Sequence, residues 1–175
     1  MADETRRLVS FLGTGRYEPV TYELDGRTAG TTPFVARALA ELVAPREIVI
    51  LATEAAEQNH GTELRRALGE TGFPEPCFVR VPEGRSRDEL GELFRILRRE
   101  LPGAGGPVVL DITHGFRAQP FFAASVLAFT RAVDDPPPEV RVVYGAFEQR
   151  SEDGKAPIRD LTYLVEVLDW TQALR

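Results

Sequence analysis

A carboxylate, a hydroxyl, an imidazole and a guanidinium lie within seven residues of one another. They belong to Asp111, Thr113, His114 and Arg117, and they follow the apolar run Val108-Val109-Leu110. Such groups bind phosphate, stabilise developing charge and transfer protons in phosphodiester chemistry. Each has a structural alternative, in which Asp111 caps the next helix, His114 is an ordinary loop histidine and Arg117 lies on the surface.

Two further polar segments follow apolar runs, at residues 13–16 and 53–54. Glycine allows a backbone to approach phosphate oxygens closely, although a glycine pair also occurs where a chain simply turns. In open α/β sheets the ligand crevice lies beyond the carboxyl ends of the strands, so we expect the three segments to share one rim. The candidate ligand-binding residues are Gly13, Thr14, Gly15, Arg16, Thr53, Glu54, Thr113, His114, Gly115, Phe116 and Arg117.

The common nucleotide and metal motifs are absent from the sequence. Glu18 stands where a dinucleotide fingerprint needs its third glycine, and no Walker sequence occurs. An unrelated Rossmann-type enzyme using a mononucleotide or nicotinamide stays open as an alternative. His60 and His114 are far apart in the sequence, and Cys77 is the single cysteine, so neither a metal site nor a disulfide is predicted. Cys77 is expected to pack inside a buried strand.

Short apolar runs alternate with stretches of helical periodicity. Strands are expected at 8–12, 20–24, 47–52, 77–81, 108–112 and 140–144, and a polar turn at 151–156. Helices are expected at 32–43, 57–69, 86–101, 120–133 and from 160 onward. The first of these helices has Thr31 or Thr32 as its predicted N-cap and Pro33 at its first position. The alternation predicts an α/β, Rossmann-like fold, with a mostly parallel central sheet flanked by helices on both faces, in a single domain over 1–175.

Composition limits the classes of function. The 175 residues are 43% hydrophobic and 27% charged, as in a folded soluble domain. The net charge of −6 disfavours extended binding to duplex DNA, whereas a compact phosphate ligand can still bind at a local loop. No apolar run is long enough for a signal peptide or a membrane span, so a cytoplasmic protein is expected.

Several of these segments resemble one known family. Residues 9–15 followed by 17–22 resemble the opening of CARF domains, the CRISPR-associated Rossmann-fold sensors, in the branch found in accessory ribonucleases of type III CRISPR systems. Residues 111–117 resemble the second motif of that branch, and residues 144–148 and 160–162 resemble its later segments. The resemblance spans nearly the whole chain.

The resemblance implies a homodimer that binds a cyclic oligoadenylate, usually cyclic tetra-adenylate, across its two-fold axis. Residues 13–16 would then wrap a phosphate, Thr53 and Glu54 would reach ribose or adenine, and residues 113–117 would line the pocket floor. Two functions follow. One is a binding module that signals to a partner, and the other is a metal-independent ring nuclease that cleaves the ligand. No cofactor is expected for either.

In the ring nuclease the resemblance implies catalytic roles for Thr14, Arg16, His114 and Arg117. An arginine would stabilise the phosphorane, and His114 would donate a proton to the leaving oxygen. The HEPN ribonuclease site of the branch, an arginine followed at short spacing by histidine, has no counterpart at His60 or His114. We therefore expect either a stand-alone CARF protein or a sensor separated from its effector.

Overall fold

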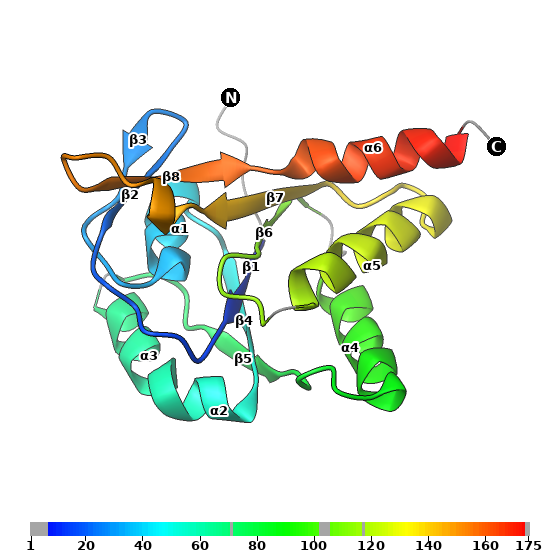
Figure 1. Ribbon diagram of the computed structural model, residues 1–175, viewed down its shortest axis with the longest axis horizontal. Coiled ribbons are helices and arrows are strands. Elements are labelled where there is room, and N and C mark those ends of the chain that lie inside the picture. The colour runs from blue at the N-terminus through cyan, green and yellow to red at the C-terminus, as the bar shows by residue number, and fades with distance from the viewer. Residues whose placement is uncertain (1–6, 71, 102–105, 117, 174–175) are drawn as a thin grey trace.

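The computed structural model describes residues 7–173, except 71, 102–105 and 117, with side chains described to residue 167. In the described part, strands and helices alternate along the chain (Figure 1). The strands are β1 (Arg7–Leu12), β2 (Thr21–Leu24), β3 (Arg27–Thr28), β4 (Glu47–Ala52), β5 (Cys77–Arg80), β6 (Val108–Asp111), β7 (Val140–Gly145) and β8 (Lys155–Asp160). The helices are α1 (Val35–Val43), α2 (Glu54–Ala56), α3 (Thr62–Gly69), α4 (Arg87–Glu100), α5 (Gln119–Val133) and α6 (Thr162–Ala173), with a π-helical turn η1 (Glu57–Gly61) and a 3-10 turn η2 (Phe147–Gln149).

The eight strands form one sheet in the order β3-β2-β8-β7-β6-β1-β4-β5. The five strands from β7 to β5 pair in parallel. Strand β8 then runs antiparallel to β7, β2 runs parallel to β8, and β3 runs antiparallel to β2. The predicted mostly parallel α/β sheet with a Rossmann-like arrangement is confirmed.

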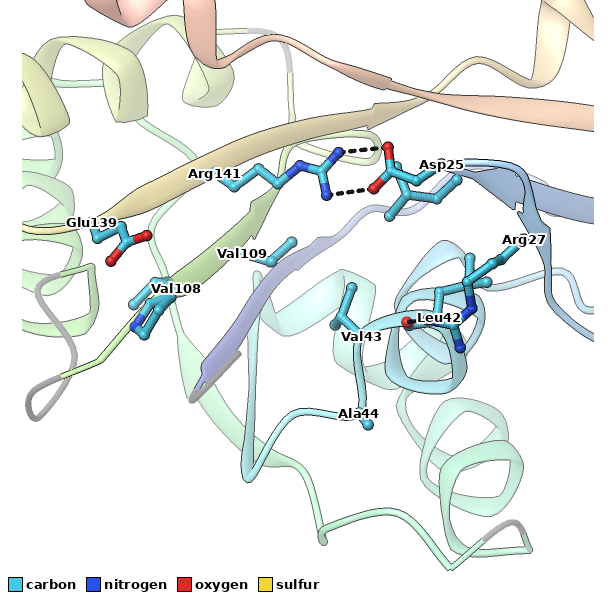
Figure 2. A pocket seen from close by; sticks show the side chains of 11 residues that line it. Asp25, Arg27, Leu42, Val43, Ala44, Val108, Val109, Glu139 and Arg141 are labelled. Carbon is cyan, nitrogen blue, oxygen red and sulfur yellow. Dashed lines mark hydrogen bonds and ion pairs between the residues drawn. The ribbon is translucent and has the colours of Figure 1, made fainter. Parts of the chain in front are cut away.

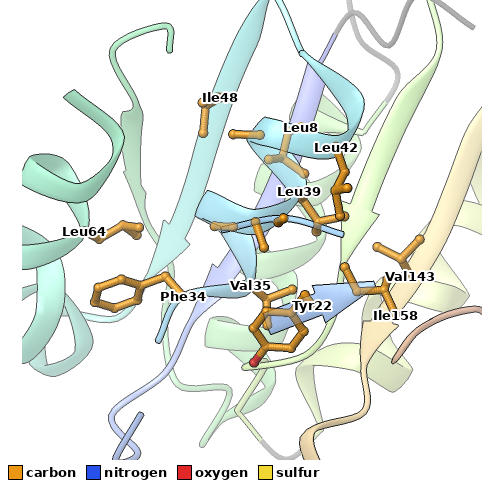
Figure 3. Close-up of a cluster of buried hydrophobic side chains, with 14 of the residues drawn as sticks. Leu8, Tyr22, Phe34, Val35, Leu39, Leu42, Ile48, Leu64, Val143 and Ile158 are labelled. Carbon is orange, nitrogen blue, oxygen red and sulfur yellow. The ribbon is translucent and has the colours of Figure 1, made fainter. Parts of the chain in front are cut away.

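Helices cover both faces of the sheet because successive side chains of its strands point to opposite sides. Leu8 and Ile48 pack with α1 and α3 on one face. Val9 and Val49 pack with α4 and α5 on the other face. Figure 1 shows the two groups of helices on either side of the strands, and Figure 3 shows the first cluster, where side chains of α1 meet those of the sheet.

The first helix begins later than its predicted start at residue 32. Thr32 instead makes two backbone hydrogen bonds with Val20, which hold it in an extended bridge. Helix α1 therefore starts at Val35, with Phe34 as the N-cap and no side-chain cap. The prediction that Thr31 or Thr32 caps this helix next to Pro33 was wrong for this reason.

The polar turn expected at 151–156 is shorter in the structure, and the strand β8 that follows it was not predicted. Ala156 and Ile158 are buried, whereas Lys155, Arg159 and Asp160 are exposed. This alternation is short, charged and interrupted by Pro157, so it gave no clear strand signal.

Cys77 is exposed, contrary to the prediction of a buried packing role. It begins β5, which lies at the edge of the sheet, and this strand exposes both of its ends. The expected strand also ends at Arg80 rather than at Val81.

Candidate functional site

The central strand β1 places two of the predicted ligand segments side by side. It pairs with β4 on one side and with β6 on the other, so the loops that follow these strands leave the same edge of the sheet. The loops after β1 and β6 form a shallow pocket of about 260 Å³. Its lining residues are Gly13, Thr14, Gly15, Arg16, Tyr17, His114, Gly115 and Phe116.

The two glycines of the first loop are needed for different reasons. A Cβ atom at Gly13 would lie 2.7 Å from the carbonyl oxygen of His114, so only glycine fits between the two loops. A Cβ atom at Gly15 would meet nothing within 4 Å. Neither residue has a positive φ. Close packing therefore requires a glycine at position 13, whereas the fold would accept a larger residue at position 15.

Tyr17 anchors this loop through hydrogen bonds to the backbone of Gly13. Its hydroxyl accepts a hydrogen bond from the Gly13 N–H at 2.9 Å and donates one to the Gly13 carbonyl at 2.8 Å. Its ring contacts the imidazoles of His60 and His114, with centroid distances of 4.5 and 4.3 Å. Burial, with a smaller contribution from the charge of Asp111, raises the pKa of Tyr17 to about 12 despite its bond to Gly13, so the phenol stays protonated and can donate.

His60 lies on the π-helical turn η1, and its Nε2 atom is 2.8 Å from the carbonyl oxygen of Gly15. A carbonyl can only accept, so Nε2 carries the proton in this contact. His60 does not line the pocket, but it contacts two of the lining residues, Gly15 and Tyr17. The two histidines, distant in the sequence, thus both contact the ring of one tyrosine.

The outer surface of the loop carries unused hydrogen-bond donors. Within the described part of the chain, the N–H groups of Thr14, Gly15 and Arg16 have no hydrogen-bond partner, and the Arg16 guanidinium has no carboxylate partner. All three residues are exposed. In a chain of net charge −6, these N–H groups and the Arg16 guanidinium are available to an anion.

Asp111 is a buried carboxylate that organises the second loop. Its side chain accepts hydrogen bonds from the Ser10 hydroxyl at 2.6 Å, from the Thr113 N–H at 2.9 Å and from the Thr113 hydroxyl at 2.5 Å. The Thr113 hydroxyl in turn accepts from the Gly145 N–H at 2.8 Å. Both functions of this hydroxyl are occupied, so Thr113, predicted as a ligand residue, positions the loop and is absent from the pocket lining.

His114 lines the pocket and is partly buried. Its Nε2 atom is buried and has no hydrogen-bond partner among the described residues. Burial lowers the pKa of His114, and nearby His60 lowers it further, while the charge of Asp111 opposes the shift. The lowered pKa favours the neutral imidazole. The role of His114 as a proton donor stays a prediction.

Phe116 is a partly exposed aromatic residue that lines the pocket, with 36% of its surface accessible to solvent. Its N–H donates to the Gln119 side-chain carbonyl at 2.8 Å, and the Gln119 amide donates to the Pro82 carbonyl at 3.1 Å. Buried Gln119 thus ties this rim to the loop that follows β5. Arg117, predicted as a catalytic and binding residue, lies outside the described residues.

The third predicted segment does not join the pocket. The Thr53 hydroxyl accepts a hydrogen bond from the Ala56 N–H at 3.2 Å and caps α2, so this helix begins before the predicted start at Glu57. Glu54 is exposed, and its Oε1 atom forms an ion pair with Nη1 of Arg80 at 3.5 Å. Neither Thr53 nor Glu54 lines the pocket described above.

A second pocket, of about 290 Å³, lies at the opposite edge of the sheet (Figure 2). It is lined mainly by the ends of β2 and α1 and the starts of β6 and β7. Its main polar group, Arg141, is held by two hydrogen bonds to Asp25 and one to Asp160. Because its charge is already paired, this pocket suits an anionic ligand less well than the loop at Arg16.

In the part of the chain that the structure describes, no group of histidine, cysteine or acidic side chains is arranged to hold a metal ion. None of the described helices is both long and apolar enough to cross a membrane.

Comparison with known proteins links the chain to one curated protein. Over 97 residues, 54% of this chain, it is 33% identical to CRISPR-associated protein MJ1674 of Methanocaldococcus jannaschii. The matched region is 15% of that protein, so this chain spans a small part of its relative. No protein-family model matches the chain. The chain is therefore similar in sequence to a CRISPR-associated protein.

Three residues that shape the site were not predicted to do so. Tyr17, His60 and Gln119 act on the loops through backbone atoms, and such contacts leave no motif in a single sequence. The position of Tyr17 directly after the loop was the only available signal. The sequence pattern suggests no role for His60 beyond the metal site that its distance from His114 disfavours.

Proposed function

We propose that this chain binds a cyclic oligoadenylate, specifically cyclic tetra-adenylate, at the pocket formed by the loops after β1 and β6, and that it acts in a CRISPR-associated response of type III. The observation that carries the proposal is the exposed surface of residues 14–16. Among the described residues, these successive N–H groups have no hydrogen-bond partner and the Arg16 guanidinium has no carboxylate partner, so the loop offers both hydrogen bonds and charge to a phosphate.

The shape of the pocket supports a ligand shared between two chains. A volume of about 260 Å³ is below the roughly 300 Å³ at which drug-sized ligands are usually enclosed. A ring of four nucleotides is far larger than this. A two-fold homodimer, in which each chain supplies the same loop, would double the site and match the symmetry of the ring.

The similarity to a CRISPR-associated protein supports the choice of ligand. Together with the resemblance of residues 9–22 and 111–117 to CARF motifs, it favours a cyclic oligoadenylate over other phosphate-bearing ligands. A sensing role requires an effector, either on a separate protein or on a further domain, to which the bound dimer passes its signal.

Cleavage of the ring is the alternative outcome. It would need an aligned ribose 2′-OH and stabilisation of charge at the phosphate, for which Thr14 and Arg16 are the exposed candidates. The buried Nε2 of His114 and its lowered pKa give no support to a histidine acid. Binding is therefore the function that the pocket supports best.

The test is to incubate the protein with labelled cyclic tetra-adenylate in a buffer containing EDTA and to follow retention and products. Retention of the intact ring supports a sensor. Conversion to linear di-adenylate with a 2′,3′-cyclic phosphate identifies a ring nuclease. If neither cyclic tetra-adenylate nor cyclic hexa-adenylate is retained or converted, the proposal is wrong.

A further inference from the structure

We propose that His60 and Tyr17 are positioning residues for anion binding. They hold the carbonyls of Gly15 and Gly13 in the loop after β1, and the N–H groups of the same two peptide bonds, those of Arg16 and Thr14, are thereby oriented for the ligand. The inference deepens the proposed function and rests on it for the identity of the natural ligand. The anion-binding geometry itself is a property of this loop.

The contact between His60 and Gly15 fixes the direction of one backbone carbonyl. The imidazole Nε2 of His60 donates to the Gly15 carbonyl at 2.8 Å, and His60 is not among the residues that line the pocket. The peptide bond from Gly15 to Arg16 is trans, so its C=O and N–H point in opposite directions. By fixing the carbonyl, His60 also fixes the Arg16 N–H, which then points away from the histidine.

Tyr17 fixes the carbonyl of Gly13 in the same way. The Tyr17 hydroxyl donates to the Gly13 carbonyl at 2.8 Å, which fixes the direction of the Thr14 N–H. The two anchors support one another, because the rings of Tyr17 and His60 are in contact at a centroid distance of 4.5 Å. His114 packs on Tyr17 from the loop after β6, at 4.3 Å.

The N–H groups of Thr14 and Arg16 have no hydrogen-bond acceptor among the described residues. Among the described residues, nothing accepts from Thr14, Gly15 or Arg16, whereas the Gly13 N–H is already bound by Tyr17. The donors that the two anchors orient are therefore the amides of Thr14 and Arg16, and Gly13 supplies none. A concave set of backbone N–H groups is a common way to bind phosphate.

The test uses the ¹⁵N-labelled full chain and two probes, inorganic phosphate and cyclic tetra-adenylate. For the unmodified protein we expect the amide signals of Thr14 and Arg16 to shift with inorganic phosphate. His60→Phe keeps an aromatic ring against Tyr17 but cannot donate. We expect about 3- to 10-fold weaker phosphate binding and a smaller shift at Arg16, with an unchanged melting temperature.

A matched variant separates positioning from packing. His60→Gln restores an N–H donor without the ring, so it should recover most of the phosphate affinity and the Arg16 shift. Tyr17→Phe should reduce the shift at Thr14 more than at Arg16. A structural role for His60 alone would instead lower the melting temperature in both variants without a selective change at Arg16.

The outcomes distinguish this inference from the proposed function. If phosphate shifts these amides in a His60-dependent manner but cyclic tetra-adenylate does not bind, the inference holds and the proposed ligand is wrong. If cyclic tetra-adenylate binds equally well to His60→Phe and to the unmodified protein, the ligand is right and the inference is wrong. If neither probe shifts the amides of residues 14–16, the inference is also wrong.

Discussion

The Tyr17 hydroxyl makes two hydrogen bonds with a single residue, accepting from the N–H of Gly13 and donating to its carbonyl. This pairing uses the backbone groups of the first glycine of the loop. The amides of the next three residues, which are exposed, have no hydrogen-bond partner in the described part of the chain. The bonds of Tyr17 therefore hold the start of the loop, and the residues after Gly13 are available to a ligand.

The two glycines are expected to respond oppositely to alanine. Gly15→Ala should leave the free energy of unfolding unchanged, or raise it by up to about 1 kcal/mol, because a Cβ atom there meets nothing within 4 Å. It should still weaken binding of cyclic tetra-adenylate at least about 10-fold, since the methyl group keeps a phosphate from the amides. Urea unfolding and a binding titration measure the two effects.

Gly13→Ala is the matched comparison. Its Cβ atom would lie 2.7 Å from the His114 carbonyl, so we expect a loss of about 1–3 kcal/mol in the free energy of unfolding. A Gly15→Ala variant that unfolds as readily as Gly13→Ala would contradict the distinction between the two positions.

Arg16→Ala should reduce the affinity for cyclic tetra-adenylate by about 10- to 100-fold without changing stability. The reason is that Arg16 has no carboxylate partner among the described residues, so its charge contributes to ligand binding and not to the fold. The salt dependence of binding should also become weaker. Arg46→Ala, which removes the same charge just before β4 at the opposite edge of the sheet, is the control and should bind normally.

Thr113→Val should destabilise the protein by about 1–3 kcal/mol, because it leaves the buried Asp111 carboxylate and the Gly145 N–H each without one hydrogen bond. Thr113→Ser keeps the hydroxyl and should retain most of the stability. Chemical denaturation of both variants tests this positioning role. Equal stability of the valine and serine variants would show that the hydroxyl contributes little.

Stability should fall as the pH is lowered through the range below about 6.5. Burial lowers the pKa of His114 in the folded chain, so the unfolded chain binds a proton that the folded chain resists. The contribution of this histidine is at most about 1.4 kcal/mol per pH unit. Urea unfolding at several pH values should show a shallower dependence for His114→Gln. An identical dependence in both proteins would exclude His114 as the cause.

The sheet and its carboxyl edge could be predicted because buried parallel strands have nearly continuous apolar sequences. Strands such as β4 and β6 are of this kind, and β1 between them sets the position of the pocket. Strand β8 could not be predicted, since its charged, proline-containing sequence becomes a strand only between β7 and β2. Secondary structure there is decided by neighbours that are distant in the sequence.

The candidate site was predictable only in part for a similar reason. Residues 13–16 and 114–116 meet in the pocket because they directly follow neighbouring strands. Thr53 was expected to reach the ligand, but its hydroxyl caps a helix, and Thr113 bonds to the buried Asp111. Whether a polar side chain serves a ligand or the fold depends on its nearest backbone donors, which a single sequence does not reveal.

The most direct test is calorimetric titration of the full chain with cyclic tetra-adenylate, together with the Gly15→Ala and Arg16→Ala variants. We predict saturable binding with one ring per two chains, and a marked loss of affinity in both variants at unchanged stability. Absence of binding at micromolar concentrations, or equal binding by all three proteins, would contradict a phosphate-binding role for the loop after β1.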